Sequence, residues 1–189
     1  MRKTENKLFL IHGYTAQPSD NWFPWLKNEI KKDNLAISLL DMPNSQNPDP
    51  LVWDDYCDMH ISQTDGITII GHSLGCIQAL RFIERHDIKQ VNLILVSGFD
   101  EKTHTLPQLA AFTDQSIDYR TVLPKINKAV VISALDDDII PYVYSETLAR
   151  HLKCKLIVMP EGKHFIDRDG ILDLPVVYDE LLAVVKNSN

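Results

Sequence analysis

The sequence predicts an α/β protein, built as a three-layer α/β/α sandwich around a mainly parallel sheet of about six strands. Short apolar runs alternate along the chain with segments whose apolar residues recur at helical spacing. Several of these runs are apolar at successive positions, which is typical of strands covered on both faces. Strands that take turns with helices favour a parallel sheet with helices on both sides.

The elements follow one another in a regular order. Apolar runs place strands at residues 7–12, 35–41, 66–71, 91–98, 129–135 and 155–162. Helical spacing places helices at residues 20–32, 53–61, 74–85 and 174–186. The stretch from Asp100 to Lys128 is polar and predicts irregular structure.

Length and composition are compatible with one compact domain over residues 1–189. The chain is 44% hydrophobic, which is enough for a continuous core. Its formal net charge of −7 disfavours binding to nucleic acid or to an anionic membrane surface. We therefore expect a small-molecule partner. The sequence contains no sustained apolar heptad, so it does not indicate an oligomeric state.

The sequence predicts neither export nor membrane insertion. The run LFLIH near the start is too short for a signal peptide, and no stretch reaches the roughly 18 apolar residues of a membrane span. The three cysteines, Cys57, Cys76 and Cys154, are widely separated. This pattern fits neither a disulfide framework nor a metal site, so we expect a cytoplasmic protein.

A serine motif follows the third expected strand. Gly71-His72-Ser73-Leu74-Gly75 fits G-x-S-x-G, in which the serine lies on a strained turn between a strand and a helix. An apolar strand precedes the motif and an amphipathic helical pattern follows it. Ser73 is therefore a candidate nucleophile, and the Leu74 amide, at the positive end of the helix, could donate to an oxyanion. The alternative is a glycine-lined turn whose serine only caps the helix.

A serine nucleophile needs a base, and the base needs an acid that fixes its tautomer. In an α/β fold with this turn, the acid and then the histidine follow later strands. Asp136, Asp137 and Asp138 come after the fifth expected strand, and His164 follows the sixth. Only one aspartate can reach the histidine, and the order of residues alone leaves open which one.

No cofactor is predicted. The H-E-x-x-H zinc motif, the P-loop and the dinucleotide-binding glycine pattern do not occur in the sequence. We therefore expect neither a metal ion nor an organic cofactor.

The segments HSLG, SALDDDIIP and EGKHF together resemble the α/β-hydrolase superfamily. With HGY, NWFPWLKNEI and DMPNSQNPDP, the chain is more narrowly similar to the small, lidless serine hydrolases of the retinoblastoma-binding-protein type and their bacterial relatives. The resemblance covers nearly the whole chain and implies an α/β-hydrolase core without a cap domain. It also implies that the acid lies four positions before Pro141, which is Asp137, although counting from the strand end selects Asp136.

The resemblance further implies a second oxyanion donor in the loop after the first strand. The amide of Tyr14 is the first choice and that of Thr15 the second. This loop has a single glycine, Gly13, where lipases have H-G-G-G, so the choice between the two amides stays open. Beside the loop residues Gly13 and Thr15, the candidates for a substrate cleft are His12, Trp22 and His72.

Two of these candidates invite other interpretations. His12 stands at a strand end, where a structural hydrogen bond is a more usual role than catalysis. His72 precedes the nucleophile, and neighbouring side chains on such a turn point apart.

These residues predict hydrolysis through an acyl-enzyme. Ser73 would attack a carbonyl carbon while His164 takes its proton, and water would then release the acyl group. Because the stretch from Asp100 to Lys128 is too short for a large cap, we expect an open site and prefer a carboxylesterase that acts on small esters. An aminopeptidase, a thioesterase and a non-catalytic binding protein on the same fold are the alternatives.

Overall fold

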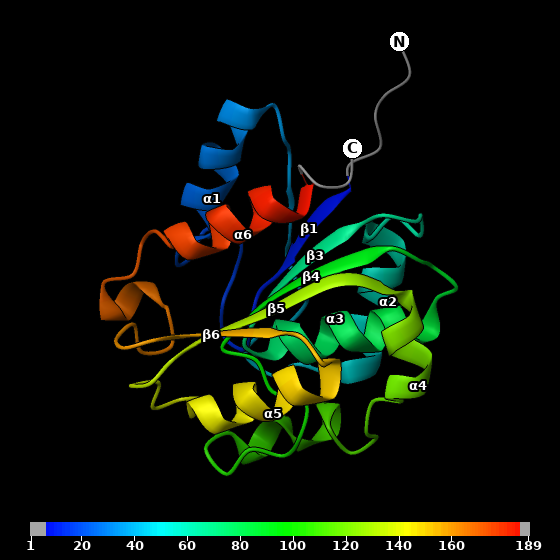
Figure 1. The fold of residues 1–189 in the computed structure, drawn as a ribbon. Coiled ribbons are helices and arrows are strands. Elements are labelled where there is room, and N and C mark those ends of the chain that lie inside the picture. Colours follow the sequence, from blue (N-terminus) through cyan, green and yellow to red (C-terminus); the bar gives the residue numbers. More distant parts are fainter. Residues whose placement is uncertain (1–6, 186–189) are drawn as a thin grey trace.

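The computed structural model describes residues 7–185, which contain a six-stranded sheet (Figure 1). Its strands are β1 (Leu8–Ile11), β2 (Ser38–Leu40), β3 (Thr68–His72), β4 (Val91–Val96), β5 (Ile126–Ala134) and β6 (Lys155–Met159). They lie in the order β2-β1-β3-β4-β5-β6, and every neighbouring pair is parallel. The predicted fold class is confirmed.

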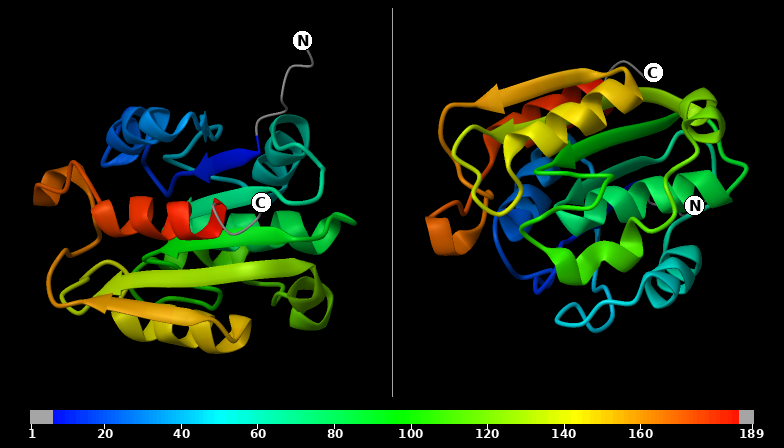
Figure 2. Two further views of the ribbon diagram at one scale, coloured as in Figure 1. Left: turned by 45° about the horizontal axis from the view of Figure 1, so that its top comes forward. Right: turned by 90° about the horizontal axis from the view of Figure 1, so that it is seen from below.

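Helices cover both faces of the sheet (Figure 2). They are α1 (Phe23–Glu29), α2 (Pro50–His60), α3 (Leu74–Arg85), α4 (Tyr119–Val122), α5 (Tyr142–Leu152) and α6 (Pro175–Val185). α1 and α6 pack on one face, and α2, α3, α4 and α5 pack on the other. The chain moves from β1 to β2 in one direction along the sheet and from β2 to β6 in the other. Because crossovers between parallel strands are right-handed, this reversal puts α1 and the later crossover helices on opposite faces.

The sheet divides the core into two apolar layers. Successive side chains of a strand point to opposite faces, so on β3 Ile69 packs toward α3 while Ile70 packs toward α1 and α6. Both side chains are fully buried. The unbroken apolar runs in the sequence are therefore the two sides of a covered parallel sheet.

Several element boundaries differ from the prediction. α2 starts at Pro50, earlier than expected, because the carboxylate of Asp49 accepts hydrogen bonds from the amides of Leu51 and Val52 and caps the helix. The stretch from Asp100 to Lys128 is not wholly irregular, since it contains α4 and two short 3-10 turns, at Pro107–Phe112 and Leu123–Lys125. The final helix is described up to Val185, and the predicted end at residue 186 lies outside the described residues.

The prediction missed α5 entirely. Its buried residues are Ser145, Leu148, Ala149 and Leu152, a helical spacing that the sequence does contain. The helix ends at Leu152, and the capping residue Lys153 adopts a left-handed conformation with φ of 52°.

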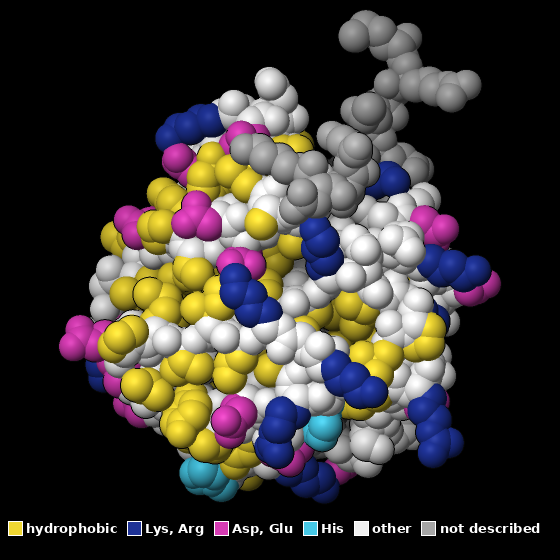
Figure 3. All heavy atoms as spheres, in the orientation of Figure 1, with side chains coloured by type: hydrophobic (Ala, Val, Ile, Leu, Met, Phe, Trp, Pro, Cys, Tyr) yellow, Lys and Arg dark blue, Asp and Glu magenta, His cyan; other side chains and the backbone are white. Residues whose placement is uncertain are grey.

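Strand β6 forms one edge of the sheet. Its residues from Leu156 to Met159 are only partly buried, and apolar side chains gather on this side of the molecule between α5 and α6 (Figure 3). Lys155 begins the strand and pairs with Glu180 of α6 at 2.6 Å. Among the described helices, none combines the length and the apolar character needed to cross a membrane.

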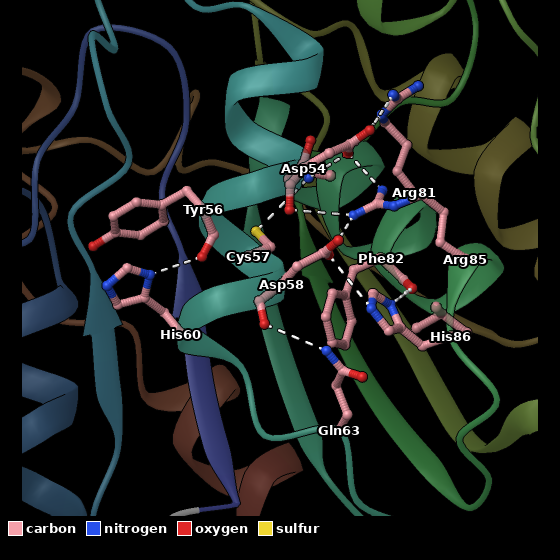
Figure 4. A network of polar contacts seen from close by, with 12 residues as sticks. Asp54, Tyr56, Cys57, Asp58, His60, Gln63, Arg81, Phe82, Arg85 and His86 are labelled. Carbon is pink, nitrogen blue, oxygen red and sulfur yellow. Dashed lines mark hydrogen bonds and ion pairs between the residues drawn. The ribbon is translucent and has the colours of Figure 1, made fainter.

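A buried carboxylate joins α2 to α3 (Figure 4). Asp54, which is 6% exposed, accepts hydrogen bonds from Gln78 Nε2 at 2.9 Å, Arg81 Nη2 at 2.6 Å and Arg85 Nη1 at 2.5 Å. Arg85 also reaches Asp58 at 2.7 Å. Because a buried charge is tolerated only when it is paired and hydrogen-bonded, this network holds α2 on the outer side of α3.

Replacing Asp54 should destabilise the fold. Asp54→Ala leaves two arginines without their shared buried counter-ion, and we expect the free energy of unfolding to fall by about 3 kcal/mol. Chemical denaturation followed by circular dichroism measures this change. Asp55→Ala alters an exposed carboxylate on the same helix and should change stability by less than about 0.5 kcal/mol. Equal losses in the two variants would contradict this interpretation of the network.

Candidate active site

A cavity of about 480 Å³ lies beyond the carboxyl ends of the strands. Its walls come from the loops after β1, β3, β5 and β6, together with Leu106 from the segment after β4. β1 and β3 are neighbours from which the chain departs in opposite directions, and parallel sheets form a crevice at such a switch point. The topology therefore gathers residues that are far apart in the sequence around one cavity.

Ser73 lines this cavity on the turn between β3 and α3. Its backbone has φ of 54° and ψ of −120°, a strained conformation for a residue with a side chain. The flanking glycines permit the turn. A Cβ on Gly71 would lie 2.8 Å from Cys76 Cα, and one on Gly75 would lie 2.1 Å from the Ile11 carbonyl oxygen. The G-x-S-x-G pattern thus reflects the close approach of α3 to β3 and β1.

His164 meets Asp137 beside the serine. His164 Nδ1 lies 3.1 Å from Asp137 Oδ1 and 2.9 Å from Oδ2, and both side chains are almost fully buried. Asp137 Oδ1 also accepts hydrogen bonds from the amides of Ile139 and Ile140, at 3.0 and 2.8 Å. Since an ionised carboxylate can only accept, Nδ1 of His164 carries a proton. In the neutral ring, Nε2 is then free to act as a base.

Asp136 has a different place. Its Oδ1 accepts a hydrogen bond from the backbone amide of Lys163 at 2.8 Å, on the loop that carries His164. Of the two aspartates that the sequence left open, Asp137 contacts the imidazole and Asp136 supports the loop.

The loop after β1 passes directly over the serine. A Cβ on Gly13 would lie 2.8 Å from Ser73 Cβ, so any larger residue would push the loop and the serine apart. Gly13, Tyr14 and Thr15 all line the cavity. The Thr15 amide donates to the Ser45 carbonyl oxygen at 2.8 Å, so it is already engaged.

His12 holds this loop from below. Its Nε2 accepts a hydrogen bond from the Met42 amide at 3.0 Å, so Nδ1 carries the proton and donates to the Gly13 carbonyl oxygen at 2.9 Å. Burial lowers the pKa of His12 and keeps the ring neutral. The structural hydrogen bond expected at this position is present, and His12 does not reach the cavity.

His72 is buried against the histidine loop and touches the cavity. Its Nε2 donates to the His164 carbonyl oxygen at 2.9 Å. Desolvation, reinforced by the nearby His164, lowers the pKa of His72 to about 3, so the ring is neutral near pH 7.

Trp22 corrects one of the expectations. The side chain is completely buried and packs edge-on against Phe23 and His72, with ring centroids 4.9 and 6.0 Å apart. It belongs to the core beneath the cavity and does not line it. Trp22 lies four positions before Leu26 of α1, a spacing that is typical of two core residues on one helical face.

Sequence reasoning missed much of the cavity wall. Leu106, Ile139 and Ile166 form apolar parts, and Asp20, Asn21, Asp167 and Arg168 form polar parts. Leu106 was detectable as an apolar residue in a polar stretch. Asn21 and Asp167 are 146 positions apart, and the hydrogen bond from the Asp167 amide to Asn21 Oδ1, at 3.0 Å, carries no local signal. Within residues 7–185, no three His, Cys, Asp or Glu side chains gather in a group that could hold a metal ion.

The chain and its fold are similar to known proteins. A family model described as serine hydrolase matches residues 8–183. The Bacillus subtilis protein YdeN is 35% identical over 180 residues, which cover 94% of this chain and 95% of YdeN. The chain belongs to the serine hydrolase family, as its motifs suggested, and the protein is a serine hydrolase.

Structures and a more distant relative agree with this assignment. The crystal structure of the ydeN gene product from B. subtilis superimposes with a TM-score of 0.90 at 34% identity, over 95% of this chain and 98% of that one. The serine hydrolase RBBP9 from Rattus norvegicus is 21% identical over 168 residues, 88% of this chain and 85% of RBBP9. Est1E from Butyrivibrio proteoclasticus shares the fold, with a TM-score of 0.70 at 16% identity over 98% of this chain and 91% of Est1E.

The buried neutral His72 should make the fold sensitive to acid. The unfolded ring takes up a proton near its usual pKa of 6.5 and the folded ring only near 3, so in between the unfolded chain binds one more proton here. Stability from this group is therefore complete above about pH 6.5 and declines as the pH falls toward 3. His72→Gln should reduce the slope of unfolding free energy against pH by about 1.4 kcal/mol per unit between about pH 4 and pH 6.

Urea denaturation at several pH values measures this slope. His60→Gln, at an exposed histidine, is the control and should leave the slope as it is in the wild type. An unchanged slope in His72→Gln would mean that the ring is protonated in the folded state.

Proposed function

We propose that this serine hydrolase is a carboxylesterase for small esters, with Ser73 as nucleophile, His164 as base and Asp137 as the acid that orients the base. The observation that carries the proposal is the buried contact of 2.9 Å between His164 Nδ1 and Asp137, on the wall of the cavity that also contains the strained Ser73. Nucleophile, base and orienting acid are the parts that acyl transfer requires.

The chemistry follows from the tautomer of the base. Because Asp137 accepts the proton on Nδ1, Nε2 of His164 can take the hydroxyl proton as Ser73 Oγ attacks the carbonyl carbon of an ester. The imidazolium then gives this proton to the leaving alcohol, and an acyl-serine remains. Water deprotonated by the same Nε2 attacks the acyl-serine, the bond from the acyl carbon to Ser73 Oγ breaks, and the carboxylic acid leaves. The imidazolium returns its proton to Ser73 Oγ. Asp137 stabilises the cationic ring during both steps.

Two backbone amides would hold the oxyanion. The Leu74 amide belongs to the first residue of α3, where the helix dipole is positive and no earlier turn supplies an acceptor. The Tyr14 amide lies in the loop that Gly13 brings against Ser73. The engagement of the Thr15 amide with Ser45 supports Tyr14 as the second donor.

Variants of the three residues test the mechanism. Ser73→Ala, His164→Ala and Asp137→Ala should each lower turnover of p-nitrophenyl acetate by at least about 10³-fold, because each removes one member of a cooperating unit. Ser73→Ala should also abolish labelling by a fluorophosphonate probe. Asp136→Ala is the matched control. Its turnover should fall by no more than about threefold to tenfold from that of the wild type, because the Asp136 carboxylate supports only the loop. A larger loss in Asp136→Ala than in Asp137→Ala would reverse the assignment of the acid.

The volume of the cavity predicts the length of the acyl chain. About 480 Å³ is at the smaller end of the usual range for ligand pockets, and apolar residues such as Leu106 and Ile139 offer an acyl group a dry wall. We expect kcat/KM to be highest for p-nitrophenyl acetate or butyrate and to fall at least about tenfold for the palmitate ester. Amino-acid p-nitroanilides belong in the same panel. Faster cleavage of these amides than of the short esters would overturn the carboxylesterase proposal in favour of an aminopeptidase.

A further inference from the structure

The proposed base, His164, lies on a loop whose strand is distant in the sheet from the strand that precedes Ser73. His164 follows β6, which is separated from β3 and Ser73 by two intervening strands. The loop that carries it is unusual, because φ is 48° at Lys163 and 53° at Phe165, a region that residues with side chains rarely occupy. Such a loop persists only where surrounding contacts determine it.

Three contacts bind Lys163 and His164 of this loop to the rest of the site. Asp137 binds the His164 ring, and Asp136 binds the Lys163 amide. The third contact is the hydrogen bond of 2.9 Å from His72 Nε2 to the His164 carbonyl oxygen. Both aspartates come from the loop after β5, whereas His72 comes from β3, so only the third contact ties the base directly to the strand of the nucleophile.

The direction of this hydrogen bond is determined by chemistry. A carbonyl oxygen can only accept, so His72 Nε2 carries the proton. His72 is 2% exposed and His164 is 4% exposed, so an unpaired carbonyl oxygen in this place would cost more than the hydrogen bond itself contributes. Trp22 and Phe23 pack edge-on against the His72 ring, at centroid distances of 6.0 and 5.7 Å, and hold it in this orientation.

We propose that His72 is a positioning residue for the hydrolysis proposed above, and that its Nε2–H holds the main chain of His164 so that the imidazole stays aligned between Ser73 and Asp137. His72 is the last residue of β3 and the direct neighbour of Ser73. Its register opposite Val96 of β4 makes it part of the rigid sheet. The position of the base relative to the nucleophile therefore depends on one side chain of the sheet as well as on the conformation of a loop.

Two substitutions separate the donor from the ring. His72→Phe keeps an aromatic ring against Trp22 but removes the donor, whereas His72→Gln keeps an N–H near the position of Nε2. We expect His72→Phe to lower kcat for p-nitrophenyl acetate by about 10- to 100-fold with KM within about twofold, since a displacement of about 1 Å has effects of this size. His72→Gln should recover kcat to within about threefold of the wild type.

The matched control is His86→Phe. His86 is a partly buried histidine whose ring, like that of His72, bonds to a backbone carbonyl oxygen, here that of Phe82 at 2.8 Å. It lies at the end of α3, away from the cavity. Its replacement should leave kcat unchanged. A loss of kcat in His86→Phe as large as in His72→Phe would overturn the proposal, because it would show a general effect of losing a buried histidine.

Spectroscopy gives a readout that a merely structural role would not move. Two-bond ¹⁵N–¹H NMR spectra of the wild type should show His72 as the Nε2–H tautomer throughout the pH range of activity. The low-field proton of His164 Nδ1–H should persist in His72→Gln and His86→Phe and should broaden or disappear in His72→Phe. The acidic limb of the kcat/KM profile should be the same in His72→Gln as in the wild type, because His72 does not carry the proton of the reaction.

Each outcome decides the matter. A protonated His72 Nδ1, a shifted acidic limb in His72→Gln, or wild-type kcat in His72→Phe overturns the proposal. If His72→Phe does not fold, His72→Gln and the wild-type tautomer decide it, and a large loss of kcat in His72→Gln counts against it. Because the inference rests on the proposed function, wild-type labelling by the fluorophosphonate probe separates the two. Absent labelling refutes the proposed function, whereas labelling at equal rates in wild type and His72→Phe refutes this inference alone.

Discussion

The close packing of α3 against β1 and β3 is the constraint on which the rest of this structure depends. At Gly71 and Gly75 no Cβ would fit, because the first turn of the helix lies against the backbone of both strands. A helix that begins so close to the end of its strand leaves the chain one residue in which to turn, and Ser73 therefore takes a positive φ. The strain, on the order of 1–3 kcal/mol, is offset by the burial of nearly the whole helix and of β3 on both faces.

Once α3 is placed, the other parts of the site follow from the parallel sheet. All carboxyl ends of the strands lie at one edge, so the loops after β1, β3, β5 and β6 must meet there. Gly13 brings the first loop against Ser73. The carboxylate of Asp137, after β5, binds His164 of the loop after β6. Two of the buried histidines, His12 and His72, each bind the backbone of one of these loops and remain neutral because burial lowers their pKa. Polar groups beneath the cavity thus define its geometry as much as the residues that face it.

The outer side of α3 is secured in a different way. Asp54 on α2 shares its carboxylate between two arginines of α3 (Figure 4). The helix that follows the serine turn is therefore held by α2 as well as by the sheet. A network of this kind is sensitive to the loss of any one partner, because the remaining charges are left partly buried. Stability and the alignment of the site are therefore coupled through one helix.

The sequence by itself determined the alternation of strands and helices, the parallel sheet, the turn around Ser73 and the order in which an aspartate and a histidine follow it. These features are local, since apolar periodicity and glycine pairs are legible in short windows. The sequence prediction missed α5, whose apolar residues are spaced for a helix but follow closely on a loop of three aspartates. It also proposed Trp22 for the cleft, whereas this side chain lies in the core.

Only the tertiary structure decided which aspartate meets His164, which backbone amide after β1 is already engaged, and that His72 reaches across to the histidine loop. Each of these contacts joins residues at or beyond the ends of different strands, 27 to 92 positions apart along the chain. Their geometry depends on how far each strand extends and how its loop turns, and those quantities arise from packing that no local pattern encodes.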